Sequence, residues 1–193
     1  FLGSEYMKKI LITGANGFVG SALCAEAVAQ GFAVRSATRS VNLRTLVSEN
    51  LNVENVVVGD ISTNTDWTDA VSNCDIVIHL AARVHVMNES ASDPLAEFRL
   101  VNMMGTEKLA LCAAANGVKR LVYVSSIKVN RESTFGGVQI LEQDQPKPQD
   151  AYGVSKWEAE QALHQVSAKT GLEIVIVRPP LVYGAGVKGI LPK

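Results

Sequence analysis

The chain has 193 residues, of which 47% are hydrophobic and 19% are charged, and its formal net charge is -1. This composition is sufficient for one globular domain with a buried core, and it is too apolar for an intrinsically disordered chain. The balance of 18 basic and 19 acidic residues disfavours nucleic acid and membrane surfaces as partners, since both are bound through an excess of positive charge. Small molecules are therefore the expected partners.

Cysteine spacing and the lack of long apolar runs favour a cytoplasmic protein that does not enter a membrane. Cys24, Cys74 and Cys112 are widely spaced and form no CxxC pair, which argues against a disulfide framework or a structural zinc site. No apolar run approaches the roughly 20 residues that span a bilayer, and no secretory signal pattern opens the chain. Residues 1–6 precede Met7 and are expected to be an extension outside a domain that covers residues 7–193.

Apolar, β-rich runs alternate with segments of helical spacing along the chain. In chain order, the expected strands are residues 10–13, 33–38, 55–58, 76–80, 121–124 and 174–177. The expected helices are residues 21–30, 66–72, 94–116 and 152–170. Gly31, Gly117 and Gly171 follow three of these helices, where a left-handed residue commonly ends a helix. This alternation predicts the α/β class: a Rossmann-type doubly wound parallel sheet with helices on both faces.

A glycine-rich turn joins the first expected strand to the first expected helix. It reads Gly14-Ala-Asn-Gly17-Phe-Val-Gly20, in the strand, turn and helix context that a dinucleotide-binding fingerprint requires. Gly14 permits a tight turn, Gly17 lets the backbone approach a pyrophosphate, and Gly20 allows close packing. NAD(P) is therefore the expected cofactor, with a purely structural turn as the alternative. The other expected contacts in the turn are Asn16, Phe18 and Val19.

The end of the second expected strand bears on which nicotinamide cofactor is bound. NAD is usually held there by a carboxylate, whereas this chain has Arg35-Ser-Ala-Thr-Arg39-Ser40. A guanidinium offers several donors to the 2′-phosphate of NADP, so NADP is favoured. Arg39 is its expected partner, with Arg35 and Ser40 as further candidates and ordinary solvated arginines as the alternative. Asp60, after the third expected strand, is a candidate acceptor for the adenine amino group or else a turn former.

A tyrosine and a lysine near the fifth expected strand suggest proton transfer. Tyr152 and Lys156 lie four residues apart at the start of an expected helix, so their side chains share one face. An ammonium near a phenol favours the phenolate, which predicts a lowered pKa for Tyr152 and a role as acid or base during hydride transfer. Ser125 and Ser126 end the strand at the edge where open α/β sheets bind ligands, and a serine hydroxyl there would polarise a carbonyl. The same spacing also arises by chance on amphipathic helices.

Seven motifs of the chain, taken together, resemble those of a known family. They are Gly14-x-x-Gly17-x-x-Gly20, Gly59-Asp60, Leu80-Ala81-Ala82, Asn102-x-x-Gly105-Thr106, Ser125-Ser126, Tyr152-x-x-x-Lys156 and Arg178-Pro179. In this order they resemble the extended short-chain dehydrogenases of the epimerase and dehydratase family, over nearly the whole chain from Met7. The resemblance implies Ser126, Tyr152 and Lys156 as the catalytic residues. The cofactor contacts that it implies are Ile61, Leu80, Ala81, Ala82, Asn102, Ser125, Tyr152, Lys156, Pro179 and Val182.

Two positions depart from the family pattern. Dehydratases of nucleotide sugars have an Asp-Glu pair just after the catalytic hydroxyl, whereas Ile127 and Lys128 stand there in this chain, which argues against 4,6-dehydration. Leu181 replaces an asparagine that contacts the substrate diphosphate in many members. The resemblance implies a nucleotide-sugar 4-epimerase or 4-ketosugar reductase. The alternatives are an NADP-dependent reductase of a non-sugar ketone, of the dihydroflavonol or hydroxysteroid type, and a nonenzymatic NADP-binding redox sensor.

The resemblance also bears on further domains and assembly. Family members usually continue into a smaller substrate-binding lobe, which is expected to be absent from this chain because it ends at Lys193. A homodimer is implied through the helix at residues 95–115, with burial of that helix in the core as the alternative. His79, His85 and His164 are far apart in the sequence and predict no metal site.

Overall fold

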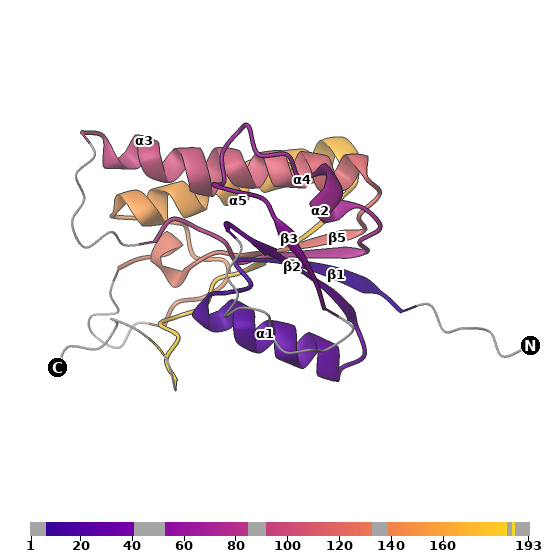
Figure 1. The fold of residues 1–193 in the computed structure, drawn as a ribbon. Coiled ribbons are helices and arrows are strands. Elements are labelled where there is room, and N and C mark those ends of the chain that lie inside the picture. The colour runs from indigo at the N-terminus through magenta and orange to yellow at the C-terminus, as the bar shows by residue number, and fades with distance from the viewer. Residues whose placement is uncertain (1–6, 41–52, 85–91, 133–138, 185–186, 188–193) are drawn as a thin grey trace, which may run out of the picture.

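The computed structural model describes residues 7–40, 53–84, 92–132, 139–184 and 187. Its centre is a six-stranded sheet in the order β3-β2-β1-β4-β5-β6, with every neighbouring pair parallel (Figure 1). The strands are β1 (Lys9–Thr13), β2 (Ala33–Thr38), β3 (Val53–Val57), β4 (Ile76–His79), β5 (Arg120–Val124) and β6 (Glu173–Val177). The strand order reverses between β1 and β4, and ligands bind at this switch point in open α/β sheets.

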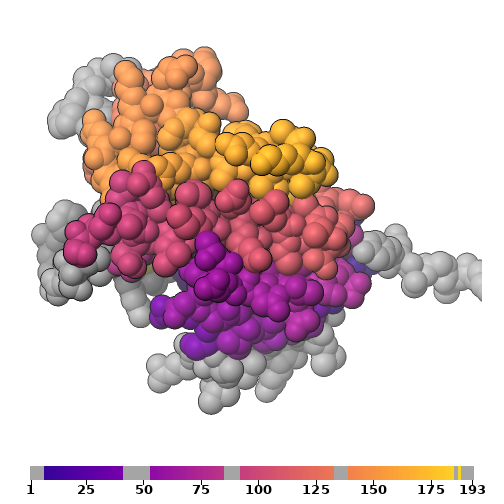
Figure 2. Space-filling model, turned by 90° about the horizontal axis from the view of Figure 1, so that it is seen from above, coloured from indigo at the N-terminus to yellow at the C-terminus, as the bar shows by residue number. Residues whose placement is uncertain are grey.

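Helices cover both faces of the sheet, which confirms the predicted doubly wound architecture. One face carries α1 (Phe18–Ala29), and the other carries α2 (Thr68–Val71), α3 (Pro94–Phe98), α4 (Gly105–Ala115) and α5 (Ala151–Thr170) (Figure 1). Figure 2 shows this second face from outside, where α4 and α5 lie side by side. The left-handed backbone predicted for Gly31, Gly117 and Gly171 is confirmed, with φ angles of 83°, 77° and 77°.

The core has two parts, one on each side of the sheet. Leu11 faces the larger cluster beneath α2, α4 and α5, whereas Ile10 and Ile12 face the smaller cluster beneath α1. This alternation follows from the two-residue period of a strand. Because both faces are covered, the central strands are apolar on both sides, and polar groups are concentrated where the strands end.

The helix expected at residues 94–116 is divided into three segments. A π-helical stretch, η2 (Arg99–Met104), separates α3 from α4. Gly105 follows this stretch, and a Cβ there would stand 2.4 Å from Ile61 Cγ2, so the segment after β3 packs directly on the start of α4. Such π-helical turns often occur beside functional sites.

Several predicted boundaries also change. α1 begins at Phe18 instead of residue 21, with Gly17 as its N-cap, and β3 begins at Val53 instead of residue 55. A short 3₁₀-helix, η3 (Ile127–Val129), follows β5.

Candidate active site

The glycine turn lies at the carboxyl end of β1. Gly14 has a φ of 66°, in the left-handed region, and a Cβ there would stand 2.8 Å from the backbone nitrogen of Ala81. A Cβ at Gly20 would stand 2.1 Å from the Gly14 carbonyl oxygen, so α1 begins in direct contact with the turn. At Gly17 the nearest described atom to a Cβ is that same oxygen, at 3.2 Å. The outer side of Gly17 and the first amides of α1 are therefore placed to face a pyrophosphate.

Substitutions at two of these glycines should separate ligand binding from stability. Gly20→Ala is expected to lower the free energy of unfolding by about 1 to 3 kcal/mol, because the new methyl group overlaps backbone. Gly17→Ala should change stability less but weaken NADH binding by at least about tenfold, because its methyl group lies where a pyrophosphate would approach. Urea unfolding and NADH fluorescence titration measure the two effects. Unchanged NADH affinity in Gly17→Ala would show that the turn does not hold the cofactor.

A buried hydrogen-bond chain fixes the segment that follows β4. The Thr13 hydroxyl accepts from the backbone N–H groups of Leu80 and Ala81, at 3.2 Å each, and lies 2.6 Å from His79 Nδ1. Because the Thr13 hydroxyl already accepts two hydrogen bonds, it donates its own proton to His79 Nδ1. The imidazole proton of His79 is then on Nε2, which lies 3.0 Å from Thr106 Oγ1. Burial lowers the pKa of His79 to about 3, so the ring is neutral. These hydrogen bonds hold Leu80 and Ala81, two predicted cofactor contacts, beside the glycine turn.

Asn102 secures the same segment from the helical side. Its side chain is buried, and its Oδ1 accepts from the Arg83 backbone N–H at 2.8 Å. Its Nδ2 donates to the Arg83 carbonyl and to Ser155 Oγ, at 3.0 Å each. These contacts indicate that Asn102 positions the segment after β4 against α5, whereas its direct contact with the cofactor stays a prediction.

Ser126 and Tyr152 meet at the carboxyl end of β5. Ser126 is the N-cap of η3, and its hydroxyl accepts from the Lys128 backbone N–H at 3.2 Å. Tyr152 lies in the first turn of α5, and the Ser126 side chain is near enough to its phenol to lower its pKa. The Phe98 ring packs edge-on against Tyr152, with 6.1 Å between the ring centroids. The structure thus brings two of the three predicted catalytic residues into contact.

Lys156, one helical turn beyond Tyr152, directs its ammonium toward the sheet. The side chain is buried, and Nζ donates to the Val124 carbonyl at 2.7 Å and lies 4.0 Å from the centroid of the Tyr123 ring. Burial lowers the pKa of Lys156 to about 7, although the Glu160 carboxylate acts in the opposite direction. The three predicted catalytic residues therefore lie on one end of the sheet, with the lysine set deeper than the two hydroxyls.

The pKa of Tyr152 corrects the sequence-based prediction. Burial is the largest influence and raises this pKa, as does the Asp150 carboxylate, while the hydrogen bond from Ser126 and the charge of Lys128 lower it. The net shift is upward. The predicted lowering by Lys156 is wrong for this arrangement because the phenol is half-buried and the lysine ammonium faces β5.

A buried carboxylate that the sequence analysis missed lies beneath this group. Glu160 on α5 is 1% exposed, and its carboxylate accepts from the Ser125 hydroxyl at 2.5 Å. Arg178, just after β6, donates to it through Nε at 3.0 Å and Nη2 at 2.5 Å, and donates to Asn130 Oδ1 at 3.2 Å. Ser125, a predicted cofactor contact, is thus bonded to Glu160. The available sequence signal was the four-residue spacing of Tyr152, Lys156 and Glu160 on one helix.

The chain after β6 crosses the carboxyl end of the sheet toward α1. The Pro179 carbonyl accepts from the Ile127 N–H at 3.0 Å, and a Cβ at Gly184 would stand 3.3 Å from Phe18 Cζ. The exposed large apolar residues at this end include Phe18, Val19, Val84, Leu181, Val182 and Tyr183. They give the glycine turn an apolar border that includes the predicted cofactor contacts Phe18, Val19 and Val182.

Arg39 and Asp60 lie where the neighbouring strands β2 and β3 end. Arg39 Nη1 is 3.6 Å from the Asp60 carboxylate, and the two side chains are 77% and 87% exposed. Ile61 packs against the start of α4 at Gly105. Arg39 is therefore accessible to an anionic ligand, but a carboxylate already stands beside its charge.

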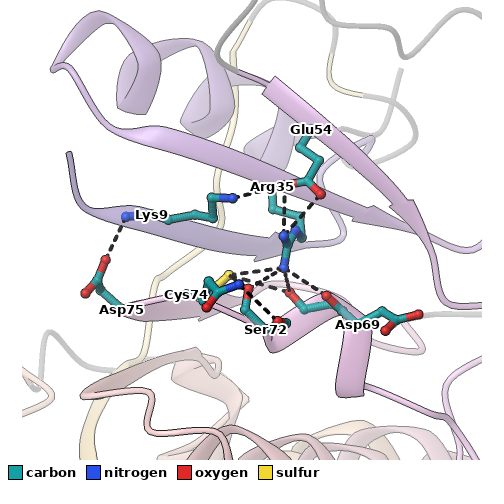
Figure 3. A network of polar contacts seen from close by, with 9 residues as sticks. Lys9, Arg35, Glu54, Asp69, Ser72, Cys74 and Asp75 are labelled. Carbon is teal, nitrogen blue, oxygen red and sulfur yellow. Dashed lines mark hydrogen bonds and ion pairs between the residues drawn. The ribbon is translucent and has the colours of Figure 1, made fainter. Parts of the chain in front are cut away.

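Arg35 is placed away from any 2′-phosphate. The residue is 6% exposed, and its Nη1 donates to the carbonyl oxygens of Asp69, Ala70 and Ser72 at 2.7 to 2.9 Å (Figure 3). Its Nη2 pairs with the Glu54 carboxylate at 2.9 Å. Arg35 thus satisfies the carbonyl groups at the end of α2. The prediction of Arg35 as a phosphate ligand is wrong because its guanidinium is already bound inside the fold.

Metal-ligating side chains are scattered over the fold. Within the described ranges, no three His, Cys, Asp or Glu residues are grouped in a way that could hold a metal ion. The helices of the described part include none that is long and apolar enough to cross a membrane. All three cysteines are free, and burial raises the pKa of Cys24 and Cys74.

The strand order, the glycine turn and the Ser126, Tyr152 and Lys156 group define a domain of the short-chain dehydrogenase type. A family model described as "NAD dependent epimerase/dehydratase family" matches residues 10–193. The chain belongs to that family, as the sequence motifs predicted.

Individual relatives agree with this assignment. The chain is 43% identical to UDP-glucose 4-epimerase from Vibrio cholerae over 183 residues, which are 94% of this chain and 54% of the relative. It is 28% identical to N-acetyl-alpha-D-glucosaminyl-diphospho-ditrans,octacis-undecaprenol 4-epimerase from Escherichia coli O157:H7, covering 93% of this chain and 50% of the relative. The solved structure of UDP-glucuronic acid 4-epimerase from Bacillus cereus in complex with NAD superposes with a TM-score of 0.77 at 27% identity, covering 91% and 57%. The chain spans about half the length of these curated relatives.

Proposed function

We propose that this domain belongs to an NAD(P)-dependent nucleotide-sugar 4-epimerase. The observation that carries the proposal is that Ser126 after β5, and Tyr152 and Lys156 on α5, lie at the carboxyl edge of the sheet, which also carries the glycine turn. The identity to UDP-glucose 4-epimerase from Vibrio cholerae favours epimerisation over net 4-ketosugar reduction. Lys128, where a dehydratase carries a carboxylate, pairs with Asp150 and Glu132, which supports the prediction against 4,6-dehydration.

The proposed reaction uses the Tyr152 hydroxyl for proton transfer and the Ser126 hydroxyl for hydrogen bonding. A nicotinamide cofactor, when bound, would supply a reversible hydride acceptor for the sugar carbon. Tyr152 takes the proton from the sugar hydroxyl as the hydride leaves and gives it back when the hydride returns. Ser126 donates a hydrogen bond to the same oxygen. Gly17 and the first turn of α1 would hold the pyrophosphate, and Lys156 would donate to the nicotinamide ribose.

Interconversion of UDP-glucose and its 4-epimer, UDP-galactose, tests the proposal. The purified protein is incubated with either sugar nucleotide and NAD, and the two sugars are distinguished by NMR. We expect interconversion in both directions with no net formation of NADH. Stoichiometric consumption of NADPH with a 4-ketosugar nucleotide, and no interconversion, would assign a ketoreductase instead. Cofactor binding with neither reaction, in a protein that also carries the substrate-binding lobe, would favour the nonenzymatic sensor.

The cofactor's adenosine end is proposed to lie at the Arg39–Asp60 pair. Arg39 favours the 2′-phosphate of NADP, whereas the Asp60 carboxylate, 3.6 Å away, repels a phosphate. Arg39→Ala is therefore expected to weaken NADPH binding by roughly five- to tenfold and NADH binding less, and Asp60→Asn should strengthen NADPH binding. Parallel fluorescence titrations with both cofactors measure the change. Equal effects on NADPH and NADH would remove the basis for preferring NADP.

Assembly and compartment complete the proposal. Leu100, Met104 and Leu111 are exposed on η2 and α4, whereas Leu109 and Ala110 are buried in the core. These exposed side chains support a homodimer formed through this helical region, and sedimentation velocity would show it as a particle of twice the monomer mass.

The free cysteines support a reducing, cytoplasmic compartment, which cell fractionation would test.

A further inference from the structure

We infer that Lys128 is a positioning residue that holds Ser126 and Tyr152 together and sets the charge balance at the phenol. The inference rests on the proposed role of Tyr152 as acid and base. Lys128 lies in η3, two residues after Ser126, and its side chain reaches the first turn of α5. It therefore connects the two elements that supply the paired hydroxyls.

The contacts of Lys128 form a closed ring. Its Nζ is 2.7 Å from Asp150 Oδ2, and Asp150 Oδ1, as the N-cap of α5, accepts from the Gly153 N–H at 2.6 Å. Tyr152 precedes Gly153, and the Ser126 side chain interacts with its phenol. The Ser126 hydroxyl in turn accepts from the Lys128 backbone N–H at 3.2 Å. Each member of the ring is thus fixed by its neighbours on both sides.

Backbone contact brings the two elements within reach of this ring. A Cβ at Gly153 would stand 2.9 Å from the Lys128 carbonyl oxygen and 3.1 Å from Asp150 Oδ1. η3 therefore lies directly against the first turn of α5, at the residue next to Tyr152. Glu132 adds a second carboxylate to Lys128, at 2.9 Å from Nζ, and orients the ammonium further.

The charges around Tyr152 come from several elements. Lys128 on η3 lowers the pKa of Tyr152, and Asp150 at the start of α5 raises it. Arg83, after β4, lies behind Phe98 with its guanidinium carbon 5.5 Å from that ring centroid. Lys156 faces β5. Lys128 and Asp150 therefore act on the phenol in opposite directions, so changing each charge gives results of opposite sign.

Alkaline absorbance titration of tyrosinate provides the test, and the difference between each protein and its Tyr152→Phe counterpart isolates Tyr152. Lys128→Met is expected to move the Tyr152 midpoint to higher pH, because the Asp150 charge is then uncompensated. Asp150→Asn, which keeps an oxygen for the N-cap, should move it to lower pH. Lys128→Arg should restore the wild-type midpoint, and Lys119→Met, at an exposed lysine, should leave it unchanged.

The two opposite shifts together decide the proposal. An unchanged midpoint in Lys128→Met, or shifts of Lys128→Met and Asp150→Asn in the same direction, would overturn it, since loss of local structure moves both variants alike. Should Lys128→Met fail to fold, the proposal still requires a lower midpoint in Asp150→Asn and a wild-type midpoint in Lys128→Arg, and any other result in either variant would overturn it. The titration needs no substrate. A wild-type protein that does not interconvert sugars would therefore contradict the proposed function, whereas the tyrosinate midpoints would still test the role of Lys128.

Discussion

Tyr152→Phe is expected to lower kcat/KM for sugar interconversion by roughly 100- to 10,000-fold, the range that a positioned acid or base contributes. The substitution removes the hydroxyl that carries the proton and keeps the ring that packs on Phe98. NADH affinity should change little because the glycine turn is untouched. Since the pKa of Tyr152 is raised, the wild-type rate should increase with pH above neutrality as the phenolate forms. The Phe variant should lose this dependence.

Initial rates over a pH series, with NADH fluorescence titration alongside, measure both parts of this expectation. Tyr183→Phe is the matched control, because Tyr183 is exposed on the segment after β6, and it should retain most of the activity. A Tyr152→Phe protein that keeps more than about a tenth of wild-type kcat/KM would reassign the acid and base role to another group.

Glu160→Ala is expected to lower the free energy of unfolding by about 3 to 5 kcal/mol, because it removes one partner of a buried ion pair. The change leaves the Arg178 guanidinium without its carboxylate and the Ser125 hydroxyl without its acceptor. It also removes the charge that raises the pKa of the buried Lys156. The connection between α5 and the segment after β6 would be lost with it.

Urea unfolding followed by circular dichroism measures the loss. Glu158→Ala provides the comparison on the same helix, since Glu158 pairs with Arg99 near the surface, at 29% and 40% side-chain exposure. An exposed pair contributes less than about 1 kcal/mol. Similar losses of unfolding free energy in the two variants would mean that the Glu160–Arg178 pair stabilises the fold no more than the surface Glu158–Arg99 pair does.

Local sequence patterns account for most of the fold because their causes are local. The apolar runs and the helix-ending glycines lie in the residues that form each element, so the alternation of strands and helices follows from spacing alone. The same holds for the glycine turn, where Gly14 and Gly20 meet atoms that are close in sequence or in the adjoining strand end. The division of the helix at residues 94–116 was missed, because Ile61, which packs at Gly105, comes from a distant segment.

In the candidate site, too, local patterns predicted which residues take part, whereas contacts between distant segments set their electrostatics. The spacing of Tyr152 and Lys156 and the place of Ser126 after a strand predicted which residues meet at the sheet edge. The direction of the Tyr152 pKa depended on burial and on Asp150 and Lys128, which spacing does not reveal. Arg35 and Arg39 look alike in the sequence, yet one is bound to the end of α2 and the other is exposed beside Asp60.

The sequence by itself predicted the class of fold, the family, the glycine turn and the Ser126, Tyr152 and Lys156 group, because each prediction rests on residue types and spacings within short motifs and on the order of those motifs along the chain. Only the tertiary structure decided the partners of the charged groups: Lys128 with Asp150, Glu160 with Arg178 and Ser125, and Arg35 with α2. Electrostatic interactions depend on distance and burial, and these are set where segments far apart in the chain pack together.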